Sequence, residues 1–142
     1  MIKKKRRKKS ERQKMVDKLD TLFSKVVRTR DRYSCQKDKC TCLNNKYVHC
    51  CHIWGRRSEA TRWDEKNAIT MCFYHHIRWS HHEPLEFSEW IKKKIGEKLY
   101  YALRKKSETP TPQRTVDELK ELYEKLKKRL AFYEKRNAEE PF

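Results

Sequence analysis

The cysteines and histidines of this chain constrain its fold more than any other feature. All six cysteines and all six histidines lie between Cys35 and His82, in a chain of 142 residues. Only 36% of the residues are hydrophobic and 40% are charged, so the chain can bury only a small apolar core. A small core usually needs disulfides or a structural metal to reach a stable fold. We therefore expect one small domain that is held together at this stretch.

The start of the chain favours a bound metal over disulfides. It runs MIKKKRRKKS with no apolar segment after it, which is unlike a secretory signal. No stretch approaches the ~20 consecutive apolar residues that a membrane-spanning helix requires. We therefore expect a cytoplasmic protein with no membrane partner, in a reducing environment where thiolates bind metal instead of pairing with each other.

Four residues have the spacing of a structural zinc site. Cys72 and His75 are separated by two residues, which brings both side chains onto one ion. Cys35 and Cys40 would supply the second pair, although four residues separate them and Cys42 is an alternative to Cys40. The sequence therefore predicts a tetrahedral Zn²⁺ site. The alternative is that some of these cysteines are reduced thiols that pack as small hydrophobic side chains.

Hydrophobic periodicity predicts two helices on either side of the cysteine and histidine stretch. Apolar residues recur at intervals of three and four between Met15 and Val27, which is typical of an amphipathic helix over residues 11 to 31. The same pattern predicts a helix over residues 86 to 106. Gly96 is a weak point in this second helix, at about 1 kcal/mol relative to alanine.

A third helix is predicted at the C-terminus. Residues 107 to 113 form a linker, and a helix is then expected within residues 114 to 142. Thr115 would be its N-cap, with Glu118 three residues later to complete a capping box. We expect the apolar stripe of this helix to pack on the core or to join two copies of the chain as a homodimer. The stripe consists of Leu119, Leu122, Leu126, Leu130 and Tyr133.

Two short strands are predicted within the cysteine and histidine stretch. Residues 47 to 53, YVHCCHI, form the first, and residues 68 to 73 form the second, which leads into a helix that starts near Cys72. Pro84 ends or redirects that helix. The expected fold class is α+β, a small zinc-stapled core with flanking helices. The expected organisation is a disordered basic tail (1–10), a domain with its N-terminal helix and zinc knuckle (11–106), a linker (107–113) and the C-terminal helix (114–142).

The net charge of +17 indicates a polyanionic partner, and nucleic acid is the first candidate. Seven of the first nine residues are Lys or Arg, and such a block repels itself until it meets phosphate. It would add salt-sensitive affinity without reading sequence. The alternatives are a solubilising tail or a nuclear localisation signal. The residues expected to contact nucleic acid are Lys3, Lys4, Lys5, Arg6 and Arg7 in the tail, with Arg56 and Arg62 in a loop.

The spacing of three polar residues indicates phosphodiester hydrolysis. A hairpin followed by a helix would place His52 at the end of the first strand, Asn67 in the turn back and His76 on the helix. A neutral imidazole can take a proton from water while a divalent ion stabilises the leaving oxygen. Asn67 would fix the loop or orient the imidazole, and Arg57 would hold the phosphate. Because adjacent helical residues point about 100° apart, His75 can serve the zinc while His76 serves a catalytic ion.

A family resemblance is carried by CHIWGRR, RWDEKN and MCFYHH, with LDTLFSKVVRTRD upstream. These segments resemble the HNH (His-Me finger) endonucleases, in particular the branch of NinG-like phage recombination proteins, over residues 17 to 105. The resemblance implies a ββα-metal finger in which His52 is the general base, Asn67 the HNH asparagine and His76 a ligand of the catalytic ion. It also points to branched or nicked DNA as the substrate and to the cytoplasm of a bacterial host.

One position departs from the family pattern. Many HNH proteins carry Asp or His directly before the base, and here Cys51 stands there, a poor ligand for Mg²⁺. Either Mg²⁺ or Mn²⁺ is held by fewer groups, with help from His81, His82 or Asp64, or a softer ion such as Ni²⁺ or Zn²⁺ is used. His49 lies two residues further back on the same strand face and is expected to be less well aimed.

The sequence therefore predicts a metal-dependent endonuclease that hydrolyses DNA phosphodiester bonds. His52 would activate water, and the ion held by His76, with His81 as a further ligand, would support the leaving 3′-oxygen. The alternative is a zinc-dependent nucleic-acid-binding module without catalysis, in which His52 and His76 are zinc ligands or ordinary polar residues. A third hypothesis is an adaptor that recruits a partner through its C-terminal helix.

Overall fold

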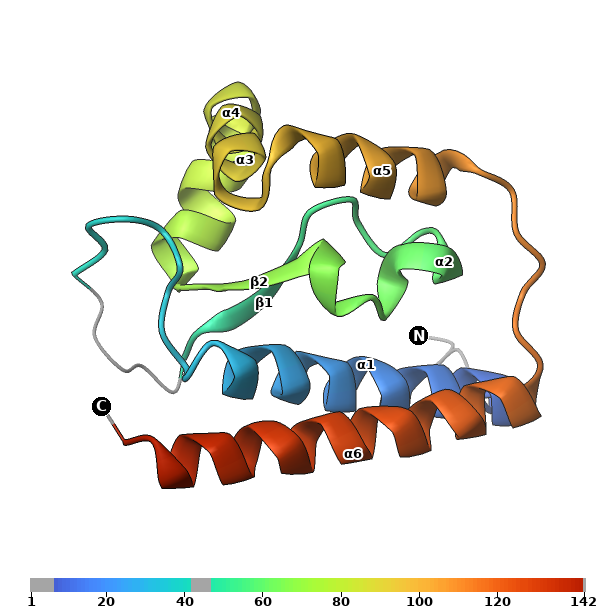
Figure 1. The fold of residues 1–142 in the computed structure, drawn as a ribbon. Coiled ribbons are helices and arrows are strands. Elements are labelled where there is room, and N and C mark those ends of the chain that lie inside the picture. The colour runs from blue at the N-terminus through green and yellow to red at the C-terminus, as the bar shows by residue number, and fades with distance from the viewer. Residues whose placement is uncertain (1–6, 42–46, 142) are drawn as a thin grey trace, which may run out of the picture.

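The computed structural model describes residues 7 to 41 and 47 to 141. It is an α+β fold, mostly helical, with a two-stranded antiparallel sheet (Figure 1). Four of the tail residues predicted to contact nucleic acid, Lys3, Lys4, Lys5 and Arg6, lie outside the described residues, as does the alternative zinc ligand Cys42. No helix in the described part of the chain is long and apolar enough to cross a membrane.

The predicted first helix and both predicted strands are confirmed. The strands pair antiparallel, with His49 opposite Met71 and His52 opposite Ala68. The helix after the second strand is a π-helix for most of its length, and Pro84 starts the next helix. The elements are α1 (Glu11–Arg30), β1 (His49–His52), α2 (Glu59–Arg62), the 3-10 turn η1 (Glu65–Asn67), β2 (Ala68–Met71), the π-helix η2 (Tyr74–Trp79), α3 (Ser80–His82), α4 (Pro84–Ile95), α5 (Glu97–Glu108) and α6 (Val116–Glu139).

The single helix predicted over residues 86 to 106 is wrong, because Gly96 separates α4 from α5. Its φ of 88° lies in the left-handed region, which glycine adopts without a steric penalty. The chain changes direction there, and Figure 1 shows α5 returning across the sheet and α2. Trp54 Nε1 donates a hydrogen bond of 3.2 Å to the Tyr100 carbonyl of α5. Since α5 continues to Glu108, the connection to α6 also starts two residues later than predicted.

The main core lies between α1, α6 and one face of the sheet. Leu19 and Phe23 of α1 share one apolar cluster with Leu119 and Leu126 of α6. Thr115 and Glu118 form the predicted capping box at the start of α6. The apolar stripe of α6 therefore packs on α1 of the same chain, and Figure 1 shows the two helices side by side. This is one of the two predicted roles, and homodimer formation stays a prediction.

A second core covers the opposite face of the sheet. Cys51, Ile69 and Met71 pack there against Ile91 of α4 and Tyr100 of α5. The sheet is therefore buried on both faces, and every residue of β2 is buried. Because successive residues of a strand point to opposite faces, Cys51 faces α4 and α5 while its neighbours Cys50 and His52 face α1.

Candidate metal and catalytic centre

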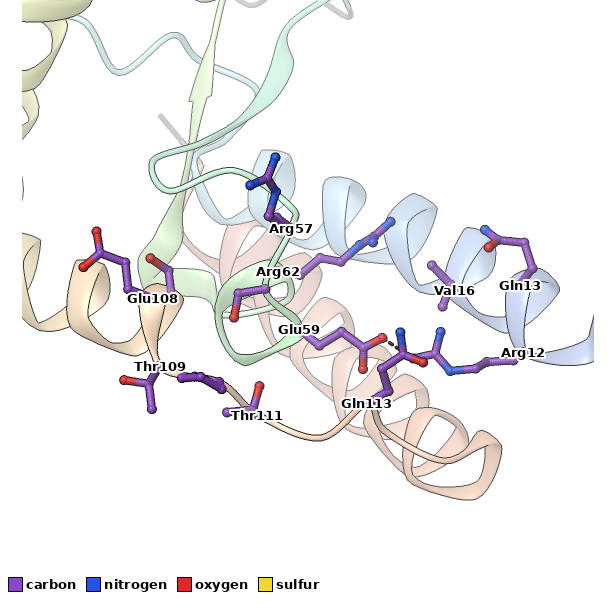
Figure 2. A pocket seen from close by; sticks show the side chains of 13 residues that line it. Arg12, Gln13, Val16, Arg57, Glu59, Arg62, Glu108, Thr109, Thr111 and Gln113 are labelled. Carbon is purple, nitrogen blue, oxygen red and sulfur yellow. Dashed lines mark hydrogen bonds and ion pairs between the residues drawn. The ribbon is translucent and has the colours of Figure 1, made fainter.

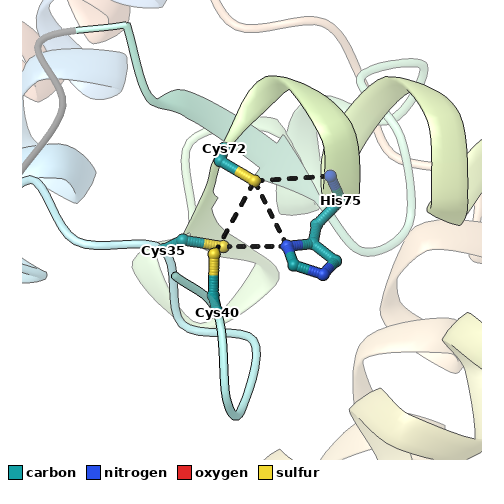
Figure 3. A group of neighbouring side chains, drawn as sticks. All are labelled: Cys35, Cys40, Cys72 and His75. Carbon is teal, nitrogen blue, oxygen red and sulfur yellow. Dashed lines mark hydrogen bonds between the residues drawn. The ribbon is translucent and has the colours of Figure 1, made fainter. Parts of the chain in front are cut away.

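The four predicted zinc ligands come together at one end of the sheet. The ligand atoms of Cys35, Cys40, Cys72 and His75 all lie within 4.8 Å of one another (Figure 3). His75 Nδ1 is 3.5 Å from Cys35 Sγ and 3.2 Å from Cys72 Sγ, and the sulfurs of Cys40 and Cys72 are 3.9 Å apart. Ligand atoms of a tetrahedral zinc site are separated by about 3.5 to 3.8 Å. The cluster could therefore hold a structural metal such as zinc.

Two local structures assemble this cluster. The loop after α1 carries Cys35 and Cys40, and it is attached to the sheet by a hydrogen bond of 2.9 Å from the Gln36 amide to the Thr70 carbonyl. Cys72 follows β2 directly, and His75 lies in the first turn of η2. Burial raises the pKa of the Cys35 thiol to about 11. A thiolate in this position therefore needs a cation beside it at neutral pH.

A second group of imidazoles lies on the other side of η2. His49 Nδ1 is 3.1 Å from His76 Nδ1, and the rings of His76 and His81 are 5.5 Å apart between centroids. Burial, with the neighbouring histidines His49, His81 and His52, lowers the pKa of His76 to about 4. The imidazole of His76 is therefore neutral at pH 7, the state in which histidine binds a metal.

His49 is better aimed than the sequence argument expected. The pairing of His49 with Met71 places the first residue of β1 beside the segment that leads into η2. Its ring nitrogen consequently meets His76 directly. Cys51, which precedes His52, is unsuitable as a ligand at this site for a further reason. It is buried in the second core, and burial raises the pKa of its thiol to about 12.

Three of the predicted histidines line one cavity of about 450 Å³. They are His52 from β1, His76 from η2 and His81 from α3. Its walls come from α1, β1, η2 and α3 and from the loop after β1. The full lining is Asp20, Ser24, Cys50, His52, Gly55, Arg56, His76 and His81.

His52 is held as a neutral imidazole with one free nitrogen. Its Nε2 donates a hydrogen bond of 2.8 Å to the Arg62 carbonyl, and since a carbonyl only accepts, the lone pair is left on Nδ1. Burial, and then the charges of Arg56 and Arg62, lower the pKa of His52, while Asp20 and the bond to the Arg62 carbonyl oppose this. Phe23 packs against the ring. The arrangement gives His52 the protonation state of a general base.

Asn67 fixes the loop after β1 and lies outside the histidine cavity. Its side chain is fully buried. Oδ1 accepts a hydrogen bond of 3.0 Å from the Trp54 amide, and Nδ2 donates one of 3.1 Å to the Thr61 carbonyl. Of the two roles that the sequence left open, these contacts correspond to fixing the loop. The loop leads to Arg62, whose carbonyl accepts a hydrogen bond from His52, so Asn67 contacts His52 only indirectly, through the loop.

The arginines of this loop are divided between two cavities. Arg56 lines the histidine cavity, whereas Arg57 lines a neighbouring one of about 510 Å³. Figure 2 shows Arg57 in that second cavity, where Glu59 forms an ion pair with Arg12. Arg56 is therefore better placed than Arg57 to hold a phosphate at the histidines. The structure does not bring Arg57 to that site.

Arg62 is committed to a contact inside the protein. Its Nε and Nη2 atoms lie 2.9 and 2.6 Å from the two carboxylate oxygens of Asp20. In this ion pair each of the two nitrogens donates to one oxygen. Trp63 Nε1 donates to the same carboxylate at 2.9 Å. This ion pair ties α1 to α2, and the contact of Arg62 with nucleic acid stays a prediction.

Asp20 and Ser24 are two of the four lining residues that the sequence argument missed, and Cys50 and Gly55 are the others. Asp20 and Ser24 lie four residues apart on α1, beside the apolar positions Leu19 and Phe23. A carboxylate at the edge of a buried helix face is a weak indication of a partner, and here the partners are Arg62 and Trp63. No motif points to either residue as part of a cavity.

Comparison of the chain with protein-family models, with curated proteins and with solved structures finds no match to any of them. The function is therefore argued from two features of the geometry. One is a cluster of three cysteines and a histidine that could bind a structural metal. The other is a cavity lined by the half-buried, neutral imidazole of His52 together with His76 and His81.

Proposed function

We propose that the protein is a metal-dependent endonuclease of the HNH (His-Me finger) type that hydrolyses phosphodiester bonds of DNA. The observation that carries this proposal is the state of His52, whose Nε2 is tied to a carbonyl and whose pKa is lowered by burial, in the cavity that His76 also lines. The order of strand, returning strand and helix supports a ββα-metal finger, with the base on β1 and a metal ligand on η2.

The residues of the cavity have different roles in the proposed reaction. His52 accepts a proton at Nδ1 from a water molecule, and the water oxygen forms a bond to phosphorus while the bond from phosphorus to the 3′-oxygen breaks. The leaving oxygen takes a proton from solvent. Arg56 is the cation at the rim that neutralises the non-bridging phosphate oxygens. A divalent ion held by His49 and His76 would stabilise the charge that develops on the phosphate and the leaving oxygen.

The donor set favours some ions over others. Imidazole nitrogens suit Mn²⁺, Ni²⁺ and Zn²⁺ better than Mg²⁺, which prefers oxygen. Asp20, the carboxylate that lines the cavity, is already bound by Arg62 and Trp63. We therefore expect Mn²⁺ or Ni²⁺ to support cleavage better than Mg²⁺, with His81 as a third protein ligand.

The charge of the chain supports DNA as the substrate. The excess of 17 positive charges favours a polyanion, and Arg56 brings one of them to the cavity. Contacts of this kind reach mainly phosphates, which position a protein without specifying a sequence. We expect modest sequence specificity and a strong dependence of binding on salt.

The experiment is cleavage of supercoiled plasmid by zinc-loaded protein, with Mn²⁺, Ni²⁺, Mg²⁺ or no added ion. His52→Ala is expected to lower the cleavage rate by about 10² to 10⁴-fold. His82→Ala is the matched control, because His82 is exposed and does not line the cavity. Circular dichroism establishes that both variants are folded. Wild-type cleavage rates in a folded His52→Ala variant would refute the proposal.

One observation favours a non-catalytic alternative, a zinc-dependent nucleic-acid-binding module. His49 and His76 meet at 3.1 Å, a separation that suits two ligands of a second structural zinc as well as those of a catalytic ion. Such a module would hold two tightly bound zinc ions per chain and would cut no DNA with any added metal. Zinc content and the plasmid assay together separate the two functions.

A further inference from the structure

Two consecutive aromatic side chains are exposed where β2 meets η2. Phe73 is 53% exposed and Tyr74 is 62% exposed, although the preceding residues Met71 and Cys72 are buried. The chain buries other large aromatic side chains, including Phe23 and Trp63. Exposed neighbouring rings in a small protein commonly mark a binding surface, because their burial would otherwise stabilise the fold.

Each ring lies against one of the two groups of metal ligands. The ring of Phe73 is 6.1 Å from that of His49 at an interplanar angle of 90°, and His49 in turn contacts His76. The ring of Tyr74 is 5.2 Å from that of His75 at 81°. A planar group stacked on Phe73 would therefore lie beside the pair of His49 and His76, and one stacked on Tyr74 would lie beside the zinc cluster.

A free cation accompanies the two rings. Arg78 follows Tyr74 by four residues on η2, is exposed, and forms no ion pair or hydrogen bond with the residues that the structure describes. Aromatic rings next to cations are the usual means of binding single-stranded nucleic acid, because the rings stack on bases while the cations contact phosphates. The net charge of +17 favours such a polyanion over an ordinary protein partner.

We infer that Phe73 and Tyr74 stack on unpaired bases of DNA next to the phosphate that is cut. Bases inside a duplex are already stacked on one another, so these rings gain a contact only where a base is unpaired. The ligand is therefore DNA with unpaired nucleotides at the cleavage position, such as a single strand, a gap or a fork. This inference rests on the proposed endonuclease function and narrows its substrate class.

The test compares the affinity of zinc-loaded protein for a fluorescein-labelled single strand of DNA with its affinity for the blunt duplex of the same sequence. Both affinities are measured by fluorescence anisotropy at one salt concentration, without Mn²⁺ or Ni²⁺. Stacking contributes about 1 to 3 kcal/mol per base, so Phe73→Leu with Tyr74→Leu should weaken single-strand binding by at least about fivefold. Duplex binding should stay within about twofold. Phe132→Leu is the matched control, an exposed aromatic residue on α6 that should change neither affinity.

Several results would overturn the inference. One is a folded, zinc-containing double variant that binds the single strand as tightly as wild type. Another is a variant that loses affinity for both DNAs equally, and a third is polyglutamate that competes as well as the single strand, which would indicate an acidic protein partner. Arg78→Gln should instead weaken binding to both DNAs and lower the salt dependence.

The failure of this inference and that of the proposed function give different results. If stacking depends on Phe73 and Tyr74 but wild type cuts no DNA with any ion, the endonuclease proposal fails and the stacking surface remains. In the opposite case, wild type cuts DNA and His52→Ala does not, but the double variant binds and cuts gapped and blunt DNA like wild type. The stacking surface then fails and the endonuclease proposal remains.

Discussion

The pair of helices α1 and α6 and the π-helix η2 are held in place by different forces. α1 and α6 share a continuous apolar interface, with Leu19 and Leu119 fully buried in it. η2 has no buried residue. Trp79 packs partly buried against the second core, and the other contacts of η2 come from His75 with the cysteines and from His76 with His49. We therefore expect the first region to fold without metal and the geometry of the second to depend on bound metal.

Removal of a zinc ligand should have the largest effect on the protein, and this effect should be confined to η2 and the zinc cluster. Cys72→Ala is expected to reduce bound zinc from one ion per chain to almost none, with the loss of a binding free energy on the order of 10 kcal/mol. Hydrogen exchange should accelerate in η2 and much less in α1 and α6. Cys50→Ala, outside the zinc cluster, is the control and should keep its zinc. Hydrogen exchange that accelerates as much in α1 and α6 as in η2 of Cys72→Ala would contradict this difference between the two regions.

Truncation in the helix pair should give the reverse pattern. Leu119→Ala is expected to lower the free energy of unfolding by about 2 to 5 kcal/mol, because it leaves a cavity in a fully buried interface. The protein that remains folded should still bind one zinc ion. Urea denaturation measures the loss, and Leu85→Ala, at an 82% exposed position, should change stability by less than about 0.5 kcal/mol.

Asn67→Ala should have a smaller effect that reaches both stability and cleavage. The change leaves the Trp54 amide and the Thr61 carbonyl without their buried partner, which costs about 1 to 3 kcal/mol. Because Asn67 acts on His52 only through the loop, cleavage should fall less than in His52→Ala. A comparison of the two variants by thermal denaturation and by plasmid cleavage checks this. An Asn67→Ala variant as stable as wild type but inactive would show a direct chemical role.

The smallest expected effect is the response of cleavage to mild acid. Protonation disables a general base, so the rate falls as the pH falls through the pKa of His52. Burial lowers that pKa below the ordinary value of 6.5, with Arg56 and Arg62 also lowering it and Asp20 raising it. Cleavage at saturating Mn²⁺ should therefore lose less than about half its rate between pH 7.5 and 6.5. A midpoint at or above pH 6.5 would argue against a buried base.

Features that depend on local sequence could be predicted. The capping box of Thr115, the periodicity of α1 and the two-residue spacing of Cys72 and His75 act over a turn or less of chain, and the structure contains all three. The break at Gly96 could not be predicted with the same means. A glycine in a helical pattern is tolerated in many helices, and only the packing of α5 over the sheet requires the left-handed conformation there.

The contacts that a side chain makes with residues distant in sequence were harder to predict. Arg56 and Arg57 are neighbours with the same chemistry, yet they line different cavities. His49 was underrated because its partner is decided by the pairing of β1 with β2. The ion pair of Arg62 was not predicted because its partner Asp20 is distant in sequence. In each case the deciding contact joins elements whose relative placement local patterns do not specify.

The adjacency of His75 and His76 on η2 joins the candidate zinc cluster to the site proposed for the catalytic ion. The amide of His76 donates to the Cys72 carbonyl at 2.9 Å, so the backbone that presents His76 belongs to the zinc cluster. Under the proposed function, zinc bound at the cluster would also fix the partner of His49, and the pair of ligands for the catalytic ion would form only afterwards. The newly synthesised chain would therefore stay inert toward DNA until zinc was available, and the zinc supply of the cell would determine how much of the protein could mature.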